Sequence, residues 1–303
     1  MEPSDSHKAH VALSRSLKED RGLPPLPGPV TFPRDMSPPP AQISPETLET
    51  PLTTAAAEMV AAAEGSSQKR EYVRRIFSEI APRYDLLNHV LSLNMDRAWR
   101  TRAVDALGWR DAPAGRYLDL CAGTLDIALN LAACDGFRGE VLASDFAEPM
   151  LRVALSKIKQ HRITPLAADA LSLPIGSATM DGAIVAFGAR NLANLETGMA
   201  EVFRVLRPGR RFVILEFGTP RNVFVRGAYH AYFHHVLPLV GRVISGHRTA
   251  YRYLPKSVSL FPSLEELGER LTRAGFVNVT WRSLTFGIAA IHVATKPLSL
   301  AHA

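Results

Sequence analysis

Two aspartates stand at the ends of predicted strands, where they could bind a nucleoside. Asp145 ends the strand pattern GEVLASD and lies 22 residues after Gly123. A carboxylate at that place and spacing can accept hydrogen bonds from both hydroxyls of a ribose. Asp169 ends the next pattern, ITPLAAD, and could accept from an adenine amino group while the N–H of Ala170 donates to a ring nitrogen. The alternative for Asp145 is structural, because DFAEPM could simply begin a helix with an N-cap.

The turn before these acids, in YLDLCAGTLD, carries a single glycine. Gly123 has no Cβ, so a ligand could approach its backbone closely. Thr124 could cap the following helix with its hydroxyl, and Leu125 is expected to take ordinary helical dihedral angles just after that cap. A pyrophosphate would need more glycines. S-adenosyl-L-methionine carries no phosphate, so the turn and the two acids together favour this cofactor, with plain helix capping as the alternative.

Five further residues could take part in catalysis or in substrate binding. Arg190 and Asn191 follow the fourth predicted strand in FGARN, and the arginine could stabilise an anionic oxygen or hold a water. His235 has an ordinary pKa near neutrality and could act as a base. Tyr84 could close the site from an N-terminal helix, and Tyr253 could flank an aromatic ring. The structural alternatives are a loop-tying ion pair for Arg190, a helix-surface or satisfied core position for His235, packing and capping at a helix break for Tyr84, and core packing for Tyr253.

Alternating strand and helix patterns indicate which elements must position these residues. Apolar residues recur at helical spacing from residue 68 until Pro82 interrupts the pattern. The alternation that follows predicts an α/β fold, a Rossmann-like methyltransferase sheet of five parallel strands and a C-terminal antiparallel pair, with helices on both faces. The expected strands are 116–121, 139–145, 163–169, 180–188, 210–218, 276–284 and 287–296, and the expected helices include 96–107, 124–134, 147–159, 195–206 and 263–274.

The proline distribution separates a tail from one folded domain. Eleven of the 22 prolines lie in the first 51 residues, where no helical or strand period is visible. Such a segment cannot bury enough apolar area to offset its ordering entropy. We therefore predict a disordered Pro/Ala/Ser-rich extension over 1–66, a methyltransferase domain over 67–297 with a substrate lid at 219–262, and a short tail over 298–303.

Charge and cysteine content indicate the environment in which the chain works. The net charge of +6 suits an anionic partner, and no run of 18 apolar residues predicts a membrane span. Aromatic and basic residues interleave from Val223 to Leu254, which could suit single-stranded nucleic acid, but a place after the fifth strand favours a lid that touches anionic lipid. Cys121 and Cys134 are expected to be reduced in a cytoplasm. The scattered histidines predict no metal site.

Several motifs resemble those of the ubiquinone/menaquinone biosynthesis C-methyltransferase family. They occur in collinear order between about residues 70 and 296 and include PRYDLLN, YLDLCAGTLD, FGARN, RVLRPGRRFVILEF, HHVLP and YRYL. The resemblance implies C-methylation of a demethylated prenyl quinol with S-adenosyl-L-methionine, the acceptor being demethylmenaquinol or the benzoquinol of the ubiquinone pathway. It also implies that the family's cofactor positions fall on Thr124, Asp145, Asp169 and Ala170.

The chain departs from the family pattern in its cofactor turn. The family usually has two glycines where Ala122 and Gly123 stand, a third where Leu125 stands, and often a serine where Ala186 stands. A Leu125 side chain that crowded the methionine tail would weaken cofactor binding, and these departures support the alternative of a non-catalytic scaffold subunit of quinone biosynthesis. Another alternative is a methyltransferase of a different aromatic or lipophilic acceptor. A nucleic-acid partner is not favoured, and the expected location is the cytoplasm, with peripheral contact at the inner face of the membrane as a hypothesis.

Overall fold

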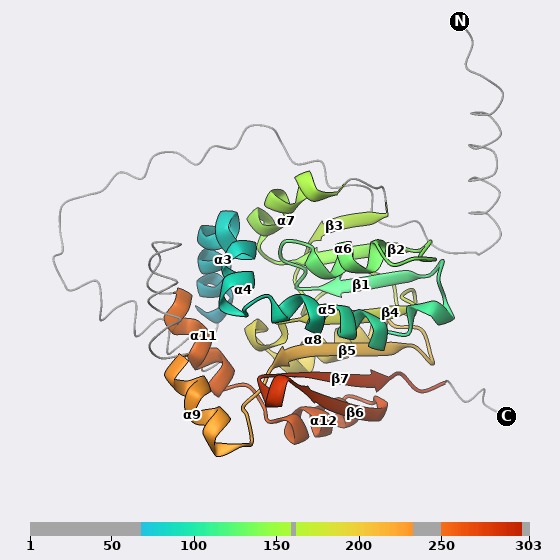
Figure 1. The fold of residues 1–303 in the computed structure, drawn as a ribbon. Coiled ribbons are helices and arrows are strands. Elements are labelled where there is room, and N and C mark those ends of the chain that lie inside the picture. The colour runs from blue at the N-terminus through green and yellow to red at the C-terminus, as the bar shows by residue number, and fades with distance from the viewer. Residues whose placement is uncertain (1–67, 159–161, 233–249, 299–303) are drawn as a thin grey trace, which may run out of the picture.

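Seven strands form one sheet in the order β3-β2-β1-β4-β5-β7-β6 (Figure 1). The computed structural model describes residues 68–158, 162–232 and 250–298. Strands β1 to β5 run parallel, whereas β7 is antiparallel to both of its neighbours, as predicted. The strands are β1 Arg116–Leu120, β2 Glu140–Asp145, β3 Ile163–Ala167, β4 Gly182–Ala186, β5 Arg211–Phe217, β6 Val277–Leu284 and β7 Ala289–Thr295.

Both faces of the sheet are buried, because side chains along each central strand alternate between two cores. In β1, Leu118 and Leu120 pack into the core that α8 and α12 cover, whereas Tyr117 packs into the core that α5, α6 and α7 cover. The helices are α3 Gln68–Ile80, α4 Tyr84–Leu91, α5 Met95–Ala106, α6 Asp126–Ala132, α7 Glu148–Ala154, α8 Leu195–Val205, α9 Val223–Ala231, α11 Ala250–Ser259 and α12 Leu264–Arg273.

Four helices gather beyond the carboxyl ends of the parallel strands. Figure 1 shows α3, α4, α9 and α11 on that side, where the two N-terminal helices come from one end of the sequence and the other two from the predicted lid. Pro82 breaks the N-terminal helical pattern as expected, since a 3₁₀ turn at Ala81–Arg83 separates α3 from α4. Ligands of open α/β sheets bind at this edge.

The expected strands and helices all form, with ends that differ by a few residues. One difference matters for the site, because α6 begins at Asp126 and not at the predicted residue 124. The predicted extension over 1–66 and residues 233–249 of the predicted lid lie outside the described residues. The domain boundaries therefore stay a prediction.

Asp119 is an acid buried beneath the turn that follows β1. Asp119 is only 1% exposed, and its Oδ2 accepts a hydrogen bond of 3.0 Å from the backbone N–H of Ala128. Burial raises the pKa of Asp119 to about 8, although the Ala128 bond works in the opposite direction. The folded protein therefore holds a proton at neutral pH that the unfolded chain releases.

We predict that this proton makes stability depend on pH. The contribution of this proton to the free energy of unfolding is fully present below the pKa of Asp119 in the unfolded chain, about 3.9. It is lost as the pH rises to the pKa of Asp119 in the folded protein, about 8. Asp119→Asn keeps an acceptor for Ala128 but does not titrate. Urea unfolding should therefore show a smaller fall in the free energy of unfolding between pH 5 and pH 8 for the variant than for the wild type. Equal falls would contradict a protonated Asp119.

Candidate functional site

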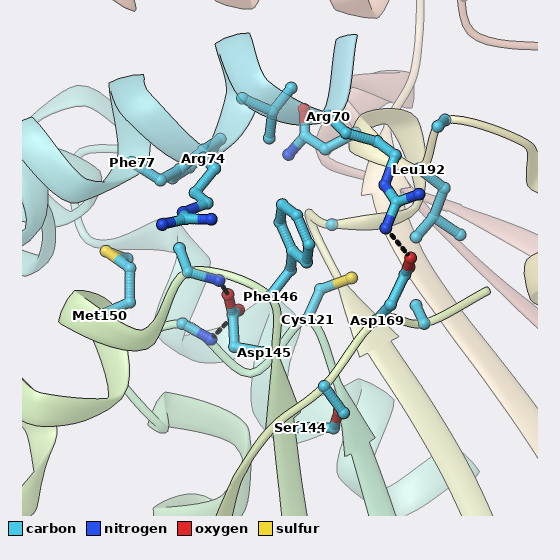
Figure 2. Close-up of a pocket in the computed structure, with 18 of the residues that line it drawn as sticks. Arg70, Arg74, Phe77, Cys121, Ser144, Asp145, Phe146, Met150, Asp169 and Leu192 are labelled. Carbon is cyan, nitrogen blue, oxygen red and sulfur yellow. Dashed lines mark hydrogen bonds and ion pairs between the residues drawn. The ribbon is translucent and has the colours of Figure 1, made fainter. Parts of the chain in front are cut away.

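A cleft lies where β1, β2, β3 and β4 end and α3 crosses in front of them (Figure 2). It has a volume of about 790 Å³, including the part open to solvent. The predicted residues Gly123, Asp145, Asp169, Ala170, Tyr84 and Asn191 all line it, together with Arg70, Arg74, Phe77, Cys121, Phe146, Met150 and Phe187. The sheet and the N-terminal helices therefore bring most of the predicted site residues together.

Asp145 joins the turns that follow β1 and β2. Its Oδ2 accepts from the N–H of Gly123 and its Oδ1 from the N–H of Ala147, each at 2.7 Å. Burial raises the pKa of Asp145, although both backbone bonds work to lower it. A carboxylate has about four acceptor positions, so both oxygens can still accept from a ribose. The structural role and the ligand role of Asp145 are therefore compatible.

Gly123 leaves room for a ligand beside the turn. Its φ of 54° lies in the left-handed region. An added Cβ would stand 3.4 Å from Cε of Met150 and 3.8 Å from the Tyr84 ring, and both of these residues line the cleft. A side chain at position 123 would thus take up cleft space and strain the backbone, which explains the glycine.

The backbone of Leu125 differs from the expectation from the sequence. Leu125 occupies the N-cap position of α6 with φ 70° and ψ 20°, so the prediction of ordinary helical angles was wrong. Its side chain is fully buried in the core with Trp99 and Ala128 and is not among the described residues that line the cleft. Burial of the side chain compensates the left-handed backbone, and the Leu125 side chain points into the core and not into the cleft.

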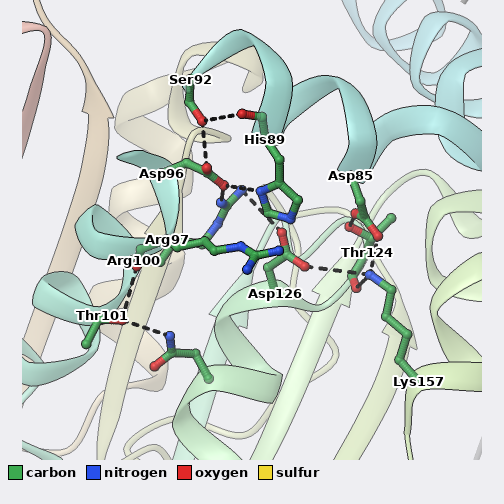
Figure 3. Close-up of polar contacts among 11 residues, drawn as sticks. Asp85, His89, Ser92, Asp96, Arg97, Arg100, Thr101, Thr124, Asp126 and Lys157 are labelled. Carbon is green, nitrogen blue, oxygen red and sulfur yellow. Dashed lines mark hydrogen bonds and ion pairs between the residues drawn. The ribbon is translucent and has the colours of Figure 1, made fainter. Parts of the chain in front are cut away.

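Thr124 does not cap α6, contrary to prediction, because the helix begins two residues later. Its hydroxyl donates to Oδ1 of Asp85 on α4 (Figure 3). Lys157 donates to Oδ2 of Asp85 and, at 3.1 Å, to the carbonyl oxygen of Thr124. The turn after β1 is therefore tied to α4, the helix that begins with Tyr84.

A second group of charges continues this network into α5 (Figure 3). Arg100 pairs with Asp96 and lies 3.4 Å from Asp126 at the start of α6. Ser92 donates to Asp96 at 2.6 Å, and the His89 ring nitrogen lies 3.0 Å away. Burial would raise the pKa of Asp96, but the Ser92 bond and the Arg100 charge outweigh it and lower the pKa. Sequence reasoning missed this network, although the four-residue spacing of Asp96 and Arg100 was a signal.

Asp169 is shared between its own turn and α3. Its Oδ1 accepts from the N–H of Leu171 at 3.0 Å, and its Oδ2 pairs with the guanidinium of Arg70. Ala170 follows it and is 5% exposed. The acid predicted to receive an adenine amino group therefore lies at the cleft, in contact with a cation that sequence reasoning did not consider.

Arg190 lies behind the cleft and is not among its described lining residues. One nitrogen, Nη1, donates to both carboxylate oxygens of Glu216, at 3.1 and 2.9 Å, and to the carbonyl of Phe187. Burial works to lower the pKa of Arg190, but the charge of Glu216 outweighs it, so the guanidinium stays protonated. The loop-tying ion pair considered for Arg190 is thus present. Sequence reasoning missed Glu216, a charged residue within the apolar strand VILEF.

Buried tyrosines adjoin Arg190 and the cleft. Tyr84 lines the cleft and packs edge-on against Phe77, with ring centroids 5.8 Å apart. Tyr253 is 3% exposed and packs in the same manner on Tyr72, at 5.7 Å. Burial raises the pKa of Tyr253 to about 12. With Tyr229, Ile76 and Ile80, the residues Tyr72 and Tyr253 form what we call the aromatic cluster, between α3, α9 and α11.

Three polar atoms near the cluster have no hydrogen-bond partner among the described residues. They are Nε of Arg190, Oδ1 of Asn191 and the hydroxyl of Tyr253, and all three are buried. His235, predicted as a base, lies outside the described residues. In the part of the chain that is described, no three His, Cys, Asp or Glu side chains gather as metal ligands, and the expected absence of a metal stays a prediction.

Sequence comparisons relate the chain to methyltransferases. The profile of the ubiE/COQ5 methyltransferase family matches residues 65–296. The demethylmenaquinone methyltransferase of Thermus thermophilus is 48% identical over 225 residues, which span 73% of this chain and 100% of that protein. The ubiquinone/menaquinone biosynthesis C-methyltransferase UbiE of Syntrophotalea carbinolica is 44% identical over 227 residues, which span 74% of this chain and 94% of the other.

Solved structures agree on the fold. A SAM-dependent methyltransferase from Thermotoga maritima superposes with a TM-score of 0.52 and 17% identity, over 73% of this chain and 98% of that one. The predicted Rossmann-like methyltransferase fold is therefore confirmed.

We predict opposite contributions from backbone and side chain at Leu125. Leu125→Ala removes the buried side chain but keeps a Cβ at positive φ, so it should lower the free energy of unfolding by about 3 kcal/mol. Leu125→Gly removes the side chain but relieves the backbone, and should be about 1 kcal/mol more stable than the alanine variant. Urea unfolding measures both. An alanine variant at least as stable as the glycine variant would contradict strain at this turn.

Proposed function

Because the chain belongs to the ubiE/COQ5 methyltransferase family, we propose that it methylates a ring carbon of a demethylated prenyl quinol in quinone biosynthesis. It is a methyltransferase that uses S-adenosyl-L-methionine. The observation that supports the assignment of the site is the cleft itself, where Asp145 and Asp169 lie at successive strand ends beside Gly123. The names of the relatives from Thermus thermophilus and Deinococcus radiodurans favour demethylmenaquinol as the acceptor.

The cleft residues fit the adenosine part of the cofactor. Asp145 has free acceptor positions for the ribose hydroxyls, and Asp169 is an acceptor that lines the same cleft as Phe146. When bound, the cofactor supplies a methyl group that its positively charged sulfur has already activated. The chain's own task is to hold donor and acceptor in line and to exclude water.

The acceptor ring is proposed to lie between the cleft and the aromatic cluster. An electron-rich carbon is needed, so the acceptor must be the reduced quinol or its phenolate. Arg190 carries a permanent positive charge, fixed by Glu216, that would stabilise a phenolate oxygen. Its Nε and the Tyr253 hydroxyl are buried donors without partners among the described residues, and Asn191 and Tyr84 line the cleft beside them. The ring proton leaves after methylation, and His235 remains a proposed base for it.

We predict that Asp145→Ala strongly weakens cofactor binding. The variant loses the acceptor for the ribose and frees the Gly123 turn, so the affinity for S-adenosyl-L-homocysteine should fall at least tenfold, since bonds to a charged acceptor contribute about 1.5–3 kcal/mol each. Titration calorimetry measures it, with the exposed Asp135→Ala as the control that keeps wild-type affinity.

The same preparation tests the acceptor. Radiolabelled methyl groups should appear on reduced demethylmenaquinol and not on the oxidised quinone. Cofactor binding without methyl transfer to demethylmenaquinol or to the benzoquinol of the ubiquinone pathway would favour a different aromatic or lipophilic acceptor. A folded wild type that binds no S-adenosyl-L-homocysteine would favour the scaffold alternative.

We also propose that the chain works at the surface of a membrane, where a prenylated quinol dissolves. Four exposed large apolar side chains support this, namely Leu93, Val223, Phe224 and Phe286, and we propose that they form one apolar patch. Phe224 is 84% exposed and Phe286 80%, more than any other large apolar side chain of the described residues. No described helix is long and apolar enough to cross a bilayer.

Contacts between the segments that carry these residues support a shared patch. The N–H of Gly218 donates to Ile288, which places the turn containing Phe286 beside the segment that leads into α9. Trp99 on α5 donates to the Thr285 hydroxyl at 2.9 Å, which links the end of the molecule near Leu93 to the same turn. Leu93 and Phe286 have φ angles of 52° and 55°. Strained backbone under an exposed apolar side chain suggests function.

The charge near the patch suits anionic lipid. Helix α9 carries Arg226 and no acidic residue, and Arg97 on α5 is also exposed. Arg221, just before α9, is 79% exposed although it pairs with Glu265. Apolar side chains surrounded by arginines are the pattern of a peripheral membrane contact.

We predict that Phe224→Ser with Phe286→Ser weakens membrane binding at least tenfold, since each buried Phe contributes about 1.5–3 kcal/mol. Co-sedimentation with vesicles of phosphatidylcholine and phosphatidylglycerol measures it, and binding should grow with the anionic fraction. Leu298→Ser removes an equally exposed residue just beyond the end of β7 and should change nothing. A wild type that stays in the supernatant with every vesicle would contradict the proposal.

A further inference from the structure

Arg70 occupies the part of the cleft that the proposed function assigns to adenine. It comes from the first turn of α3, and its guanidinium pairs with Oδ2 of Asp169. The guanidinium carbon also stands 5.5 Å from the centroid of the Phe146 ring. Figure 2 shows Arg70 reaching across the cleft to Asp169, with Phe146 beside it.

These two contacts match the chemistry of adenine. A guanidinium is planar and has N–H donors along its edge, and an adenine ring is planar with an amino donor on its edge. Phe146 follows Asp145 directly, so its ring lies where a base attached to the ribose would stack. Only one planar group, either the guanidinium or the adenine ring, can cover the Phe146 ring at a time. Arg70 and adenine therefore compete.

Each oxygen of Asp169 keeps a second acceptor position, so it is the space that Arg70 fills beside Oδ2 that favours competition over shared binding. Its Oδ1 is engaged by the N–H of Leu171, at 3.0 Å, within the turn after β3. Its Oδ2 is the oxygen that Arg70 holds. An adenine amino group that approached through the cleft would meet Oδ2 and therefore the Arg70 guanidinium.

We propose that Arg70 is an internal competitor for the adenine subsite, which cofactor entry displaces and cofactor release restores. This inference rests on the proposed function, because it assigns the subsite to adenine. The Arg70 side chain is 50% exposed, so the displaced guanidinium can move into water without loss of a buried contact. Arg70 thereby sets the cofactor affinity and links it to the position of α3.

The opposite role for Arg70 would be a cover that stacks on the outer face of bound adenine. The two roles predict opposite signs. Removal of a competitor strengthens cofactor binding, whereas removal of a cover weakens it.

The test measures the dissociation constant of S-adenosyl-L-homocysteine by titration calorimetry for the wild type and for Arg70→Ala. We expect the variant to bind about three- to tenfold more tightly, the range given by a partly exposed ion pair together with a cation–π contact. Arg75→Ala is the matched control, because it removes the same side chain from an exposed position of α3 that does not line the cleft. Its affinity should equal that of the wild type.

Ionic strength gives a second readout. Salt screens a partly exposed ion pair, so the wild-type affinity for this ligand, whose net charge is zero at neutral pH, should rise with salt more than that of Arg70→Ala. Equal or weaker binding by Arg70→Ala, with intact wild-type binding, would overturn the inference and leave the proposed function standing. Absence of binding by the folded wild type and by both variants would overturn the two together.

Discussion

The carboxylate of Asp145 is the contact on which the shape of the site depends. It holds the turn after β1 through Gly123 and the turn after β2 through Ala147, and so determines how far apart the two turns stand. Both bonds go to backbone N–H groups, which ordinary side-chain changes cannot remove. Because the acid is nearly buried, its charge needs these donors. A single side chain therefore builds the wall of the cleft and also offers the acceptor positions that a ribose needs.

Backbone strain concentrates around this contact. Cys121, Leu125 and Phe187 all have positive φ, and each lies in a turn after β1 or β4. The surrounding core holds these conformations, as the full burial of Leu125 shows. The ion network from Asp85 to Asp96 and the buried pair of Arg190 with Glu216 add further restraint. The site is thus rigid on the side of the sheet, whereas α3 contributes half-exposed arginines.

The fold and the adenosine half of the site were predictable from the sequence, because each feature is local. Strand patterns that end in an acid place Asp145 and Asp169 without knowledge of distant contacts. Predictions from the sequence missed contacts whose partner is far away along the chain. Thr124 binds Asp85, 39 residues earlier, and Asp169 binds Arg70, 99 residues earlier. The prediction for the backbone of Leu125 was wrong for another reason, because core packing overrides the local backbone preference of a leucine.

The strand order also has a consequence during synthesis on the ribosome. β5 lies between β4 and β7, so one of its edges stays unpaired until residue 295 has been made and has left the exit tunnel. An unpaired, largely apolar strand is a template for wrong pairing with another chain. The nascent protein therefore exposes this edge throughout the translation of α9, α11 and α12. Chaperone binding during that interval would affect its yield more than its final stability.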